Sequence, residues 1–215
     1  DADSVAGDAT NFALRVPEVP GPIFEVGVHL NEDVSFDLDH VGWKGNPNVT
    51  FERPKHKGLM WRRAWVDAVD QLLGWSEMFR LVQNEGLGMI SQGAREWTDY
   101  TVTADVTPHL VSRAGVAARV QGLTRFYALV VTREQKVQML KCVHGESVIA
   151  EADFAWSFGD TLEMTLSVVE DQLVGQVNGK TLLTARDSSL DAGAAGLIVE
   201  DGRSATHKVR VSSSD

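Results

Sequence analysis

The sequence predicts an all-β fold, and three observations support it. Between Trp97 and Arg133, successive segments either alternate apolar and polar residues with a period of two or are apolar throughout, as strands do and helices do not. Asn178 and Gly179 lie between two later segments of this kind, and both tolerate the positive φ of a tight hairpin turn. In all, about ten such segments occur at regular spacing, which is typical of a sandwich or barrel.

The individual strands follow from this alternation. The segment 126–132 is apolar on both faces, which predicts a central strand covered on both sides. Asp201-Gly202 is expected to form a turn between the last two strands. The expected strands of the sandwich are 100–106, 114–121, 126–132, 136–144, 148–154, 161–169, 173–177, 181–185, 195–200 and 206–211.

The stretch 61–84 has two readings. Trp61, Trp65, Val69 and Leu72 fall at helical spacing, which favours an amphipathic helix. Gly74 interrupts this stripe, and tryptophan is a poor helix former. Helix and strand both stay open for this stretch.

The N-terminal part is expected to be a separate β segment. Two strands, 24–30 and 34–40, read as a hairpin, and a third short strand ends at Phe51. A polar break at 55–58 divides the chain into an N-terminal β segment and linker, 1–58, and a sandwich, 59–215. The N-terminal strands either complete the sandwich or end a preceding β-domain.

Composition excludes several classes of partner. The chain has 30 acidic and 20 basic residues, and its formal charge of −10 argues against nucleic acid and anionic membranes as main partners. No apolar stretch approaches the ~20 residues of a membrane helix. The single cysteine, Cys142, allows no intrachain disulfide and is expected to be buried. The acidic N-terminus is unlike a signal peptide, so a cytoplasmic location is favoured and secretion stays open.

The sequence resembles known families in its strand order and in two further stretches. The strand order from Trp97 onward resembles the opening of the concanavalin A-like, laminin G-type jelly-roll sandwich, whose members mostly bind or cut carbohydrate. The stretches VSFDLDHVGWKGNPNVTFERP and MWRRAWVDAVDQ resemble the C-terminal extension of some bacterial proteins of the ADP-ribosylglycohydrolase family. The resemblance implies that a helical hydrolase domain, whose acidic residues hold magnesium, is covalently attached ahead of this chain.

Catalysis within the chain has one candidate. Retaining glycosidases on this fold place three acids on one strand, and Glu151 and Asp153 match the first two, but the third acid is missing. These carboxylates are expected on the solvated face of a strand. The sequence therefore predicts a non-catalytic carbohydrate- or glycoconjugate-binding accessory module. A glycoside-active enzyme with an unrecognised acid pair and a structural or dimerisation domain are the alternatives.

Ligand-binding residues are expected on the central strands. Arg119 and Gln121 lie on a polar strand face, and Tyr127 on the next strand supplies a ring and a hydroxyl. Lys141 comes from the strand after that. Small neighbours of Arg119 indicate open space above the sheet for a sugar. In the alternative, Arg119 pairs with an acid such as Asp105 or Glu151 and contacts no ligand.

A calcium site is the remaining expectation. Asn84 and Glu85 open the sandwich, while Glu200 and Asp201 lie near its close. First and last strands of such folds are commonly neighbours, so these oxygens could converge on a hard cation. The alternative is two ordinary acidic turns. Asp37 and Asp39, which share a strand face, form a weaker candidate pair.

Overall fold

The computed structural model describes residues 47–53, 60–73 and 79–214. All of them belong to one unit of the chain, Phe36–Asp215. The predicted strands 24–30 and 34–40, the pair Asp37 and Asp39, and the predicted boundary at 55–58 lie outside the described residues. None of the helices in the described part has the length and hydropathy needed to cross a membrane.

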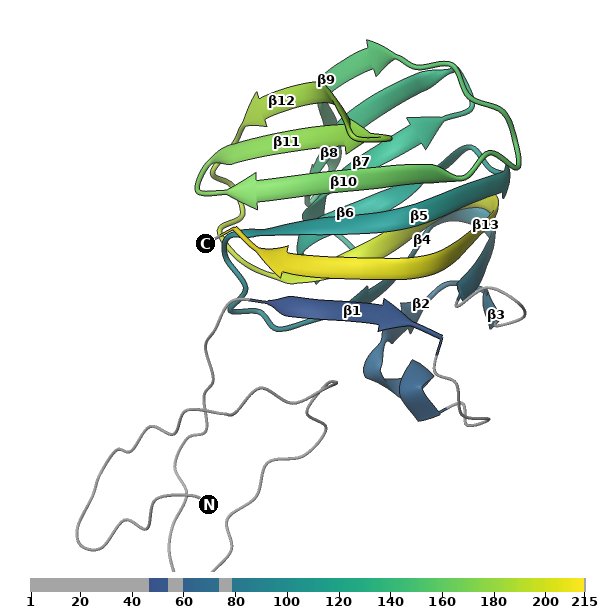
Figure 1. Ribbon diagram of the computed structural model, residues 1–215, viewed down its shortest axis with the longest axis horizontal. Helices are drawn as coiled ribbons and strands as arrows, with labels where there is room; N and C mark the ends of the chain where they lie inside the picture. Colours follow the sequence, from purple (N-terminus) through teal and green to yellow (C-terminus); the bar gives the residue numbers. More distant parts are fainter. Residues whose placement is uncertain (1–46, 54–59, 74–78, 215) are drawn as a thin grey trace, which may run out of the picture. The chain divides into compact units, whose positions relative to one another are not determined.

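The described residues are almost entirely β-structure (Figure 1). The stretch with two readings contains one short 3-10 helix, η1, followed by two short strands. In chain order the elements are β1 (Asn48–Glu52), η1 (Met60–Ala64), β2 (Val66–Ala68), β3 (Gln71–Leu73), β4 (Phe79–Gln92), β5 (Tyr100–Leu110), β6 (Arg113–Gly122), β7 (Arg125–Thr132), β8 (Lys136–Val143), β9 (Glu146–Asp153), β10 (Leu162–Val169), β11 (Gln172–Val177), β12 (Lys180–Arg186) and β13 (Ala194–Ser213).

Strand β13 belongs to both layers of the sandwich. Its first part pairs with β4 and β6, and from β6 the sheet continues through β7, β8 and β9. Its second part pairs with β5, from which the other layer continues through β10, β11 and β12. The two layers are therefore one sheet folded over at its longest strand, and the protein is an all-β jelly-roll sandwich, as predicted (Figure 1).

The change of layer takes place at Asp201 and Gly202. The sequence predicts a turn here, but β13 runs through these residues, and its register against β4 shifts between Glu200 and Gly202. Asp201 has a φ of 44°, the left-handed conformation that a turn would also use. The turn prediction is wrong because a bulge inside a strand requires the same backbone conformation as a tight turn.

The other predicted turns and faces agree with the structure. Asn178 and Gly179 both have positive φ, 52° and 73°, and connect β11 to β12 as a tight hairpin. Seven of the eight residues of β7 are buried, so both faces of this strand are covered as predicted. Cys142 is buried and forms no disulfide.

The main core fills the space between the two layers. Apolar residues with a period of two point inward from each strand, such as Tyr100 and Val102 of β5 and Met164 and Leu166 of β10. A second buried cluster takes the opposite parity on β7, with Phe126, Ala128 and Val130 as members. Residues of β7 therefore contribute to a buried cluster on each face of this strand.

The N-terminal β segment contributes one described strand. Strand β1 runs antiparallel to the second part of β13, with Thr50 opposite Arg210. Phe51 packs edge-to-face on Trp65, whose ring in turn lies 4.8 Å from that of Phe79. The described strand of this segment therefore extends the sheet at β13, and the predicted division at residue 58 stays a prediction.

Candidate functional site

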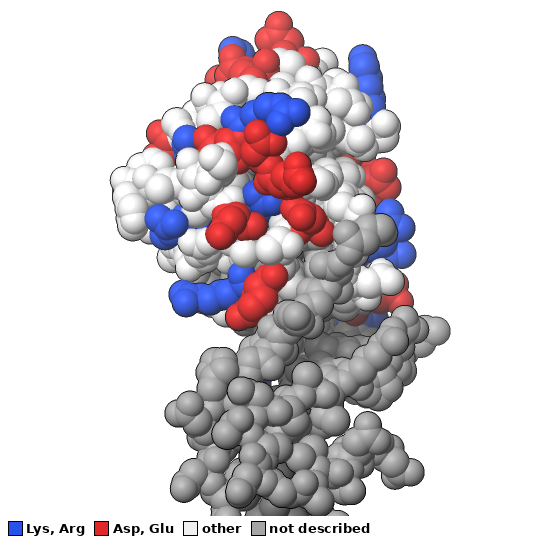
Figure 2. All heavy atoms as spheres, turned by 90° about the vertical axis from the view of Figure 1, so that its left-hand side faces the viewer, with Lys and Arg blue, Asp and Glu red and all other residues white. Residues whose placement is uncertain are grey.

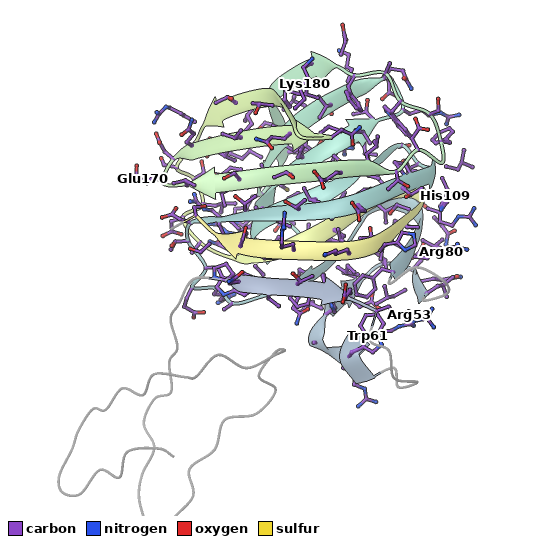
Figure 3. The ribbon with its side chains drawn as sticks, in the orientation of Figure 1. Arg53, Trp61, Arg80, His109, Glu170 and Lys180 are labelled. Carbon is purple, nitrogen blue, oxygen red and sulfur yellow. The ribbon has the colours of Figure 1, made fainter. Side chains whose placement is uncertain are left out.

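The structure separates two candidate regions at opposite ends of the strands (Figure 3). One lies at the turn between β10 and β11, which Glu170 marks. The other lies at the end of β5 that His109 marks, where the backbone N–H of Gly159 bonds the carbonyl of Pro108. The sequence-predicted ligand residues fall at the first end, and a hollow that the sequence does not predict lies at the second.

At the Glu170 end, all four predicted ligand residues contact the connection between β12 and β13, here called segment 187–193. Arg119 donates to the carbonyl of Leu190 at 2.8 Å, and Gln121 donates to that of Ala192 at 2.9 Å. Tyr127 donates to Asp187, and Lys141 bonds Asp187 and Ser189. The sequence correctly groups these residues, and the partner they share in the structure is a segment of their own chain.

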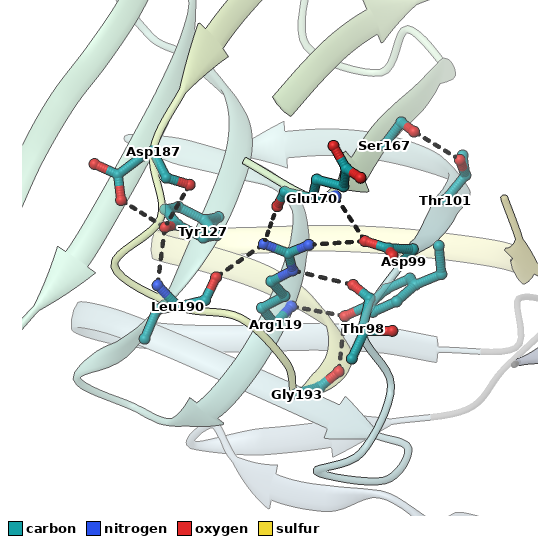
Figure 4. Close-up of polar contacts among 11 residues, drawn as sticks. Thr98, Asp99, Thr101, Arg119, Tyr127, Ser167, Glu170, Asp187, Leu190 and Gly193 are labelled. Atoms are coloured by element: carbon teal, nitrogen blue, oxygen red, sulfur yellow. Dashed lines mark hydrogen bonds and ion pairs between the residues drawn. The ribbon is translucent and has the colours of Figure 1, made fainter. Parts of the chain in front are cut away.

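Arg119 is buried, with 1% of its surface exposed. Its guanidinium donates to the carbonyls of Thr98, Glu170 and Leu190 and pairs with Asp99 at 3.2 Å (Figure 4). The expectation of open space above this residue is wrong, because a left-handed conformation at Arg119, with a φ of 49°, turns the side chain into the end of the sandwich. The alternative, pairing with an acid, is correct in kind, although the acid is Asp99.

Tyr100 and Tyr127 flank Arg119 on the two sides. The Tyr100 hydroxyl accepts the backbone N–H of Arg119 at 2.6 Å and lies 2.9 Å from the carbonyls of Gly193 and Ala194. The Tyr127 hydroxyl donates to the Asp187 carboxylate at 2.6 Å and accepts the backbone N–H of Leu190 at 3.1 Å. Neither ring is exposed, so Tyr127 offers no aromatic face to a ligand in this conformation.

The Asp187 carboxylate is held in its charged form. Burial would raise its pKa, but hydrogen bonds from Lys141, Tyr127 and Ser189 outweigh burial and keep the pKa well below its usual range. Lys141 lies 2.5 Å from this carboxylate. Figure 2, which views this end of the molecule directly, shows Asp and Glu side chains gathered on it, with Lys and Arg side chains among them. The polar side chains discussed here thus find their hydrogen-bond partners within the chain, and the surface at this end is mainly acidic.

We expect the two tyrosines to titrate abnormally. Burial, followed by the hydrogen bond to Asp187, raises the pKa of Tyr127 to about 12, and burial also raises the pKa of Tyr100. Because both pKa values are higher in the folded state, their contribution to stability is complete below pH 10 and is lost as the pH rises through the folded values.

Ultraviolet difference spectroscopy tests this directly, since Tyr100 and Tyr127 are the chain's 2 tyrosines. Tyrosinate absorbance should not appear near pH 10 but should rise at about pH 12 or above, together with loss of the β-sheet circular dichroism signal. The unfolded chain in urea should titrate near pH 10. A folded protein that shows half of the absorbance change near pH 10 would contradict the buried network.

The predicted calcium residues are neighbours, as expected of the first and last strands, because β4 pairs with β13. Two of the four side chains already use their carboxylates within the chain: Asp201 accepts the backbone N–H of Gly86 at 2.6 Å, and Glu200 pairs with Arg113. Asn84 donates to Asp70, and the backbone carbonyl of Glu85 accepts from Gln83. No group of three or more His, Cys, Asp and Glu able to hold a metal occurs within 47–53, 60–73 and 79–214. Calcium binding here stays a prediction.

Glu151 and Asp153 lie exposed on β9, as predicted. Glu151 pairs with Lys136 and accepts a hydrogen bond from Gln138 at 2.6 Å. The Lys136 ammonium, then Gln138, lowers the pKa of Glu151, which keeps the carboxyl ionised. A general acid needs a raised pKa, so this geometry gives Glu151 the charge state opposite to that role.

At the other end, a hollow of about 350 Å³ is lined by Arg133, Gln135, Trp156, Ser157 and Phe158. Arg133 and Gln135 come from the turn between β7 and β8, and the other three come from the connection between β9 and β10. Phe158 is 45% exposed, a large value for an aromatic ring. Its ring packs edge-to-face on Trp156 with the centroids 5.3 Å apart.

Hydrogen bonds hold this hollow in shape. The indole of Trp156 donates to the Thr132 carbonyl at 2.9 Å, and its backbone N–H donates to the Gln135 side-chain oxygen at 2.9 Å. Beyond Phe158, the backbone N–H of Gly159 donates to the Pro108 carbonyl at 2.7 Å. The exposed ring of Phe158 therefore sits between two anchored neighbours, and the hollow is preformed.

Strand patterns do not reveal this site because Phe158 lies in a connection without periodicity. The sequence does contain a signal. Phe158 lies between Ser157 and Gly159, which are typical turn residues, and packing in a turn does not require an aromatic side chain there. Trp156 is expected to be part of the core, and the structure places it there, 7% exposed, with one edge on the hollow.

Comparison with known proteins identifies the fold. No protein-family description matches the chain, and no curated protein matches its sequence. Among solved structures, a carbohydrate-binding module of family 66 from Bacillus subtilis superposes with a TM-score of 0.65 at 20% identity, covering 70% of this chain and 96% of that one. A Bacillus subtilis protein of unknown function with a galectin-like fold gives 0.54 at 13% identity, covering 77% and 98%.

Larger enzymes contain a similar sandwich as one part of their length. A sialidase superposes with a TM-score of 0.58 at 10% identity, covering 78% of this chain but 18% of the enzyme. At these identities the likeness concerns the fold. The chain is thus a jelly-roll sandwich of the architecture seen in carbohydrate-binding modules and in parts of carbohydrate-active enzymes.

Proposed function

We propose that the protein is a non-catalytic carbohydrate-binding module whose sugar site is the hollow around Phe158. The observation that carries the proposal is the exposed Phe158 ring, fixed by Trp156 beside Arg133, Gln135 and Ser157. The jelly-roll architecture shared with a carbohydrate-binding module supports it.

The chemistry of the hollow suits a sugar ring. The C–H face of a pyranose or furanose packs on an aromatic ring, while its hydroxyls need directed hydrogen bonds. Because the Gln135 side-chain oxygen is used by Trp156, its amide nitrogen remains as a donor, and the Ser157 hydroxyl can donate or accept. A volume of about 350 Å³ lies at the lower end of ligand pockets and suits a short stretch of glycan.

The lining favours binding over hydrolysis. Glycoside hydrolysis needs two carboxylates on either side of the scissile bond. Among the described residues the hollow is lined by no carboxylate, and the Asp160 carboxylate next to it accepts the backbone N–H of Ser157 at 2.8 Å. The enzymatic alternative therefore finds no acid pair at this site.

Replacement of Phe158 by alanine tests the assignment. We expect glycans identified by array screening to lose at least tenfold in affinity, about 1.4 kcal/mol, by titration calorimetry, because the stacking surface is removed. The melting temperature should stay close to wild type, since the ring is 45% exposed. Leu123→Ala, at an exposed apolar residue between β6 and β7, is the matched control and should bind normally.

The same titration distinguishes the competing interpretations. If Gln121→Ala or Lys141→Ala abolishes binding and Phe158→Ala does not, the sugar site lies at the Glu170 end and our assignment is wrong. Release of reducing sugar by the wild-type chain would show an enzyme instead. A stable dimer by sedimentation, without binding to any glycan, would favour the structural role.

We also propose that the module serves a larger hydrolase. The resemblance of the chain to the extension of ADP-ribosylglycohydrolase-family proteins supports this role, as does the occurrence of a similar sandwich within longer enzymes such as the sialidase. An open reading frame in which a helical hydrolase domain is continuous with this sequence would bear it out, and a frame without any enzyme domain would refute it.

A further inference from the structure

We infer that the hollow selects an acidic sugar, one carrying a carboxylate, through Arg133. This inference rests on the proposed function and adds the chemical class of its ligand. Its starting point is the charge of the lining: Arg133 is the single ionisable side chain among the five described residues that surround the hollow. In a chain with a formal charge of −10, this site carries a formal charge of +1.

The Arg133 guanidinium is free to meet a ligand. Its backbone is fixed, because the N–H of Arg133 donates to the Ser112 carbonyl at 2.9 Å and the following turn is closed by a bond from Gln135 to Thr132. Its side chain is exposed, and within the described residues it has no hydrogen-bond or ion-pair partner. The charge is therefore uncompensated at the rim of the hollow.

Nearby carboxylates are engaged with other groups. Glu146 and Glu200 share Arg113, at the start of β6. Glu151 pairs with Lys136, which follows the β7–β8 turn. Glu134, next to Arg133 in the chain, does not line the hollow. Asp160, next to the hollow, accepts the backbone N–H of Ser157 and does not line the hollow either. An approaching carboxylate thus finds a cation that forms no ion pair with any acid of the described residues.

The hollow offers a partner for each of the two parts of a uronic acid, the sugar ring and the carboxylate. Phe158 offers an apolar face for the ring C–H groups, while the planar guanidinium of Arg133 can donate two parallel hydrogen bonds to a carboxylate. Repulsion from acidic groups farther away than about 8 Å is screened at physiological ionic strength, whereas Arg133 lines the hollow itself. A neutral sugar would use the ring face and leave the charge unpaired.

A matched pair of ligands tests the inference. Oligogalacturonates and oligoglucuronates are compared by titration calorimetry with the same oligosaccharides methyl-esterified, which removes the charge and keeps the ring. We expect the acids to bind at least tenfold tighter than the esters, and this ratio should fall as ionic strength rises. Arg133→Gln, which keeps a planar donor without charge, should bring the ratio close to one. Arg203→Gln, at an exposed arginine of β13, should leave it unchanged.

The outcomes separate the inference from the function on which it rests. Neutral glycans that bind at least as well as acidic ones, with loss of binding in Phe158→Ala, would overturn the acidic preference and leave the sugar-binding function in place. An acidic preference that survives Arg133→Gln would overturn the role of Arg133. Failure of every acidic and neutral glycan to bind would overturn both.

Discussion

Replacement of Arg119 by methionine is expected to destabilise the protein by about 3–5 kcal/mol, because each buried carbonyl that loses its donor costs about 1–3 kcal/mol. Arg119 connects Thr98, Glu170 and Leu190 through their carbonyls at one end of the sandwich. Methionine fills similar space but leaves these three acceptors without their donor, and it removes the ion pair with Asp99, whose carboxylate keeps the backbone N–H of Glu170. The melting temperature should fall by roughly 6–20 °C.

Two further variants make this result interpretable. Arg203→Met changes an exposed arginine of β13 and should leave the melting temperature within about 2 °C of wild type. Arg119→Lys keeps the charge but cannot reproduce the fork of donors, so its loss of stability should be intermediate. A melting temperature of Arg119→Met equal to that of Arg203→Met would show that the buried network contributes nothing to stability.

The second large effect is expected at Gly202, where β13 passes from one layer to the other. A Cβ atom there would lie 1.6 Å from the backbone oxygen of Leu110 and 2.7 Å from the Cα of Val111. Both are backbone atoms, one of the last residue of β5 and one of the residue that follows it, so the clash cannot be relieved by a side-chain rotation. Gly202→Ala should therefore cost at least about 3 kcal/mol in the free energy of unfolding.

Chemical denaturation measures this cost against a second glycine. Gly145 lies between β8 and β9, and a Cβ atom added to it would meet no described atom within 4 Å. Gly145→Ala should therefore change the free energy of unfolding by at most about 1 kcal/mol. If both alanine variants unfold at the same denaturant concentration, the close approach of β13 to the end of β5 does not constrain the fold.

The sequence predicts the strands of this fold well because their residues alternate. Strands β5 to β12 begin and end within a few residues of the predicted ranges. The alternation also predicts that both faces of β7 are covered. By contrast, the helical spacing of Trp61 and Trp65 is misleading: these rings pack with Phe79 around a single 3-10 turn. Aromatic clustering at a corner and the stripe of a helix produce the same spacing.

The candidate sites depend on breaks in alternation, which the sequence does not reveal. The regular alternation up to Ala118 predicts an open face for Arg119. Its left-handed backbone and the register shift between Ala118 and Gly122 change the direction of the side chain. The same limit applies to Phe158, which no strand pattern covers. Side-chain direction within strands is thus predictable from sequence, while that at bulges and connections is not.

The position of β13 after all the other described strands has a consequence for synthesis on the ribosome. Strands β1, β4, β5 and β6 all hydrogen-bond to it, yet each leaves the ribosome before Ala194. Until β13 emerges, these four strands expose unpaired edges that can join another nascent chain. We therefore expect a ribosome-stalled chain that ends before Ala194 to be protease-sensitive and to recruit chaperones, and acquisition of protease resistance to coincide with the emergence of β13.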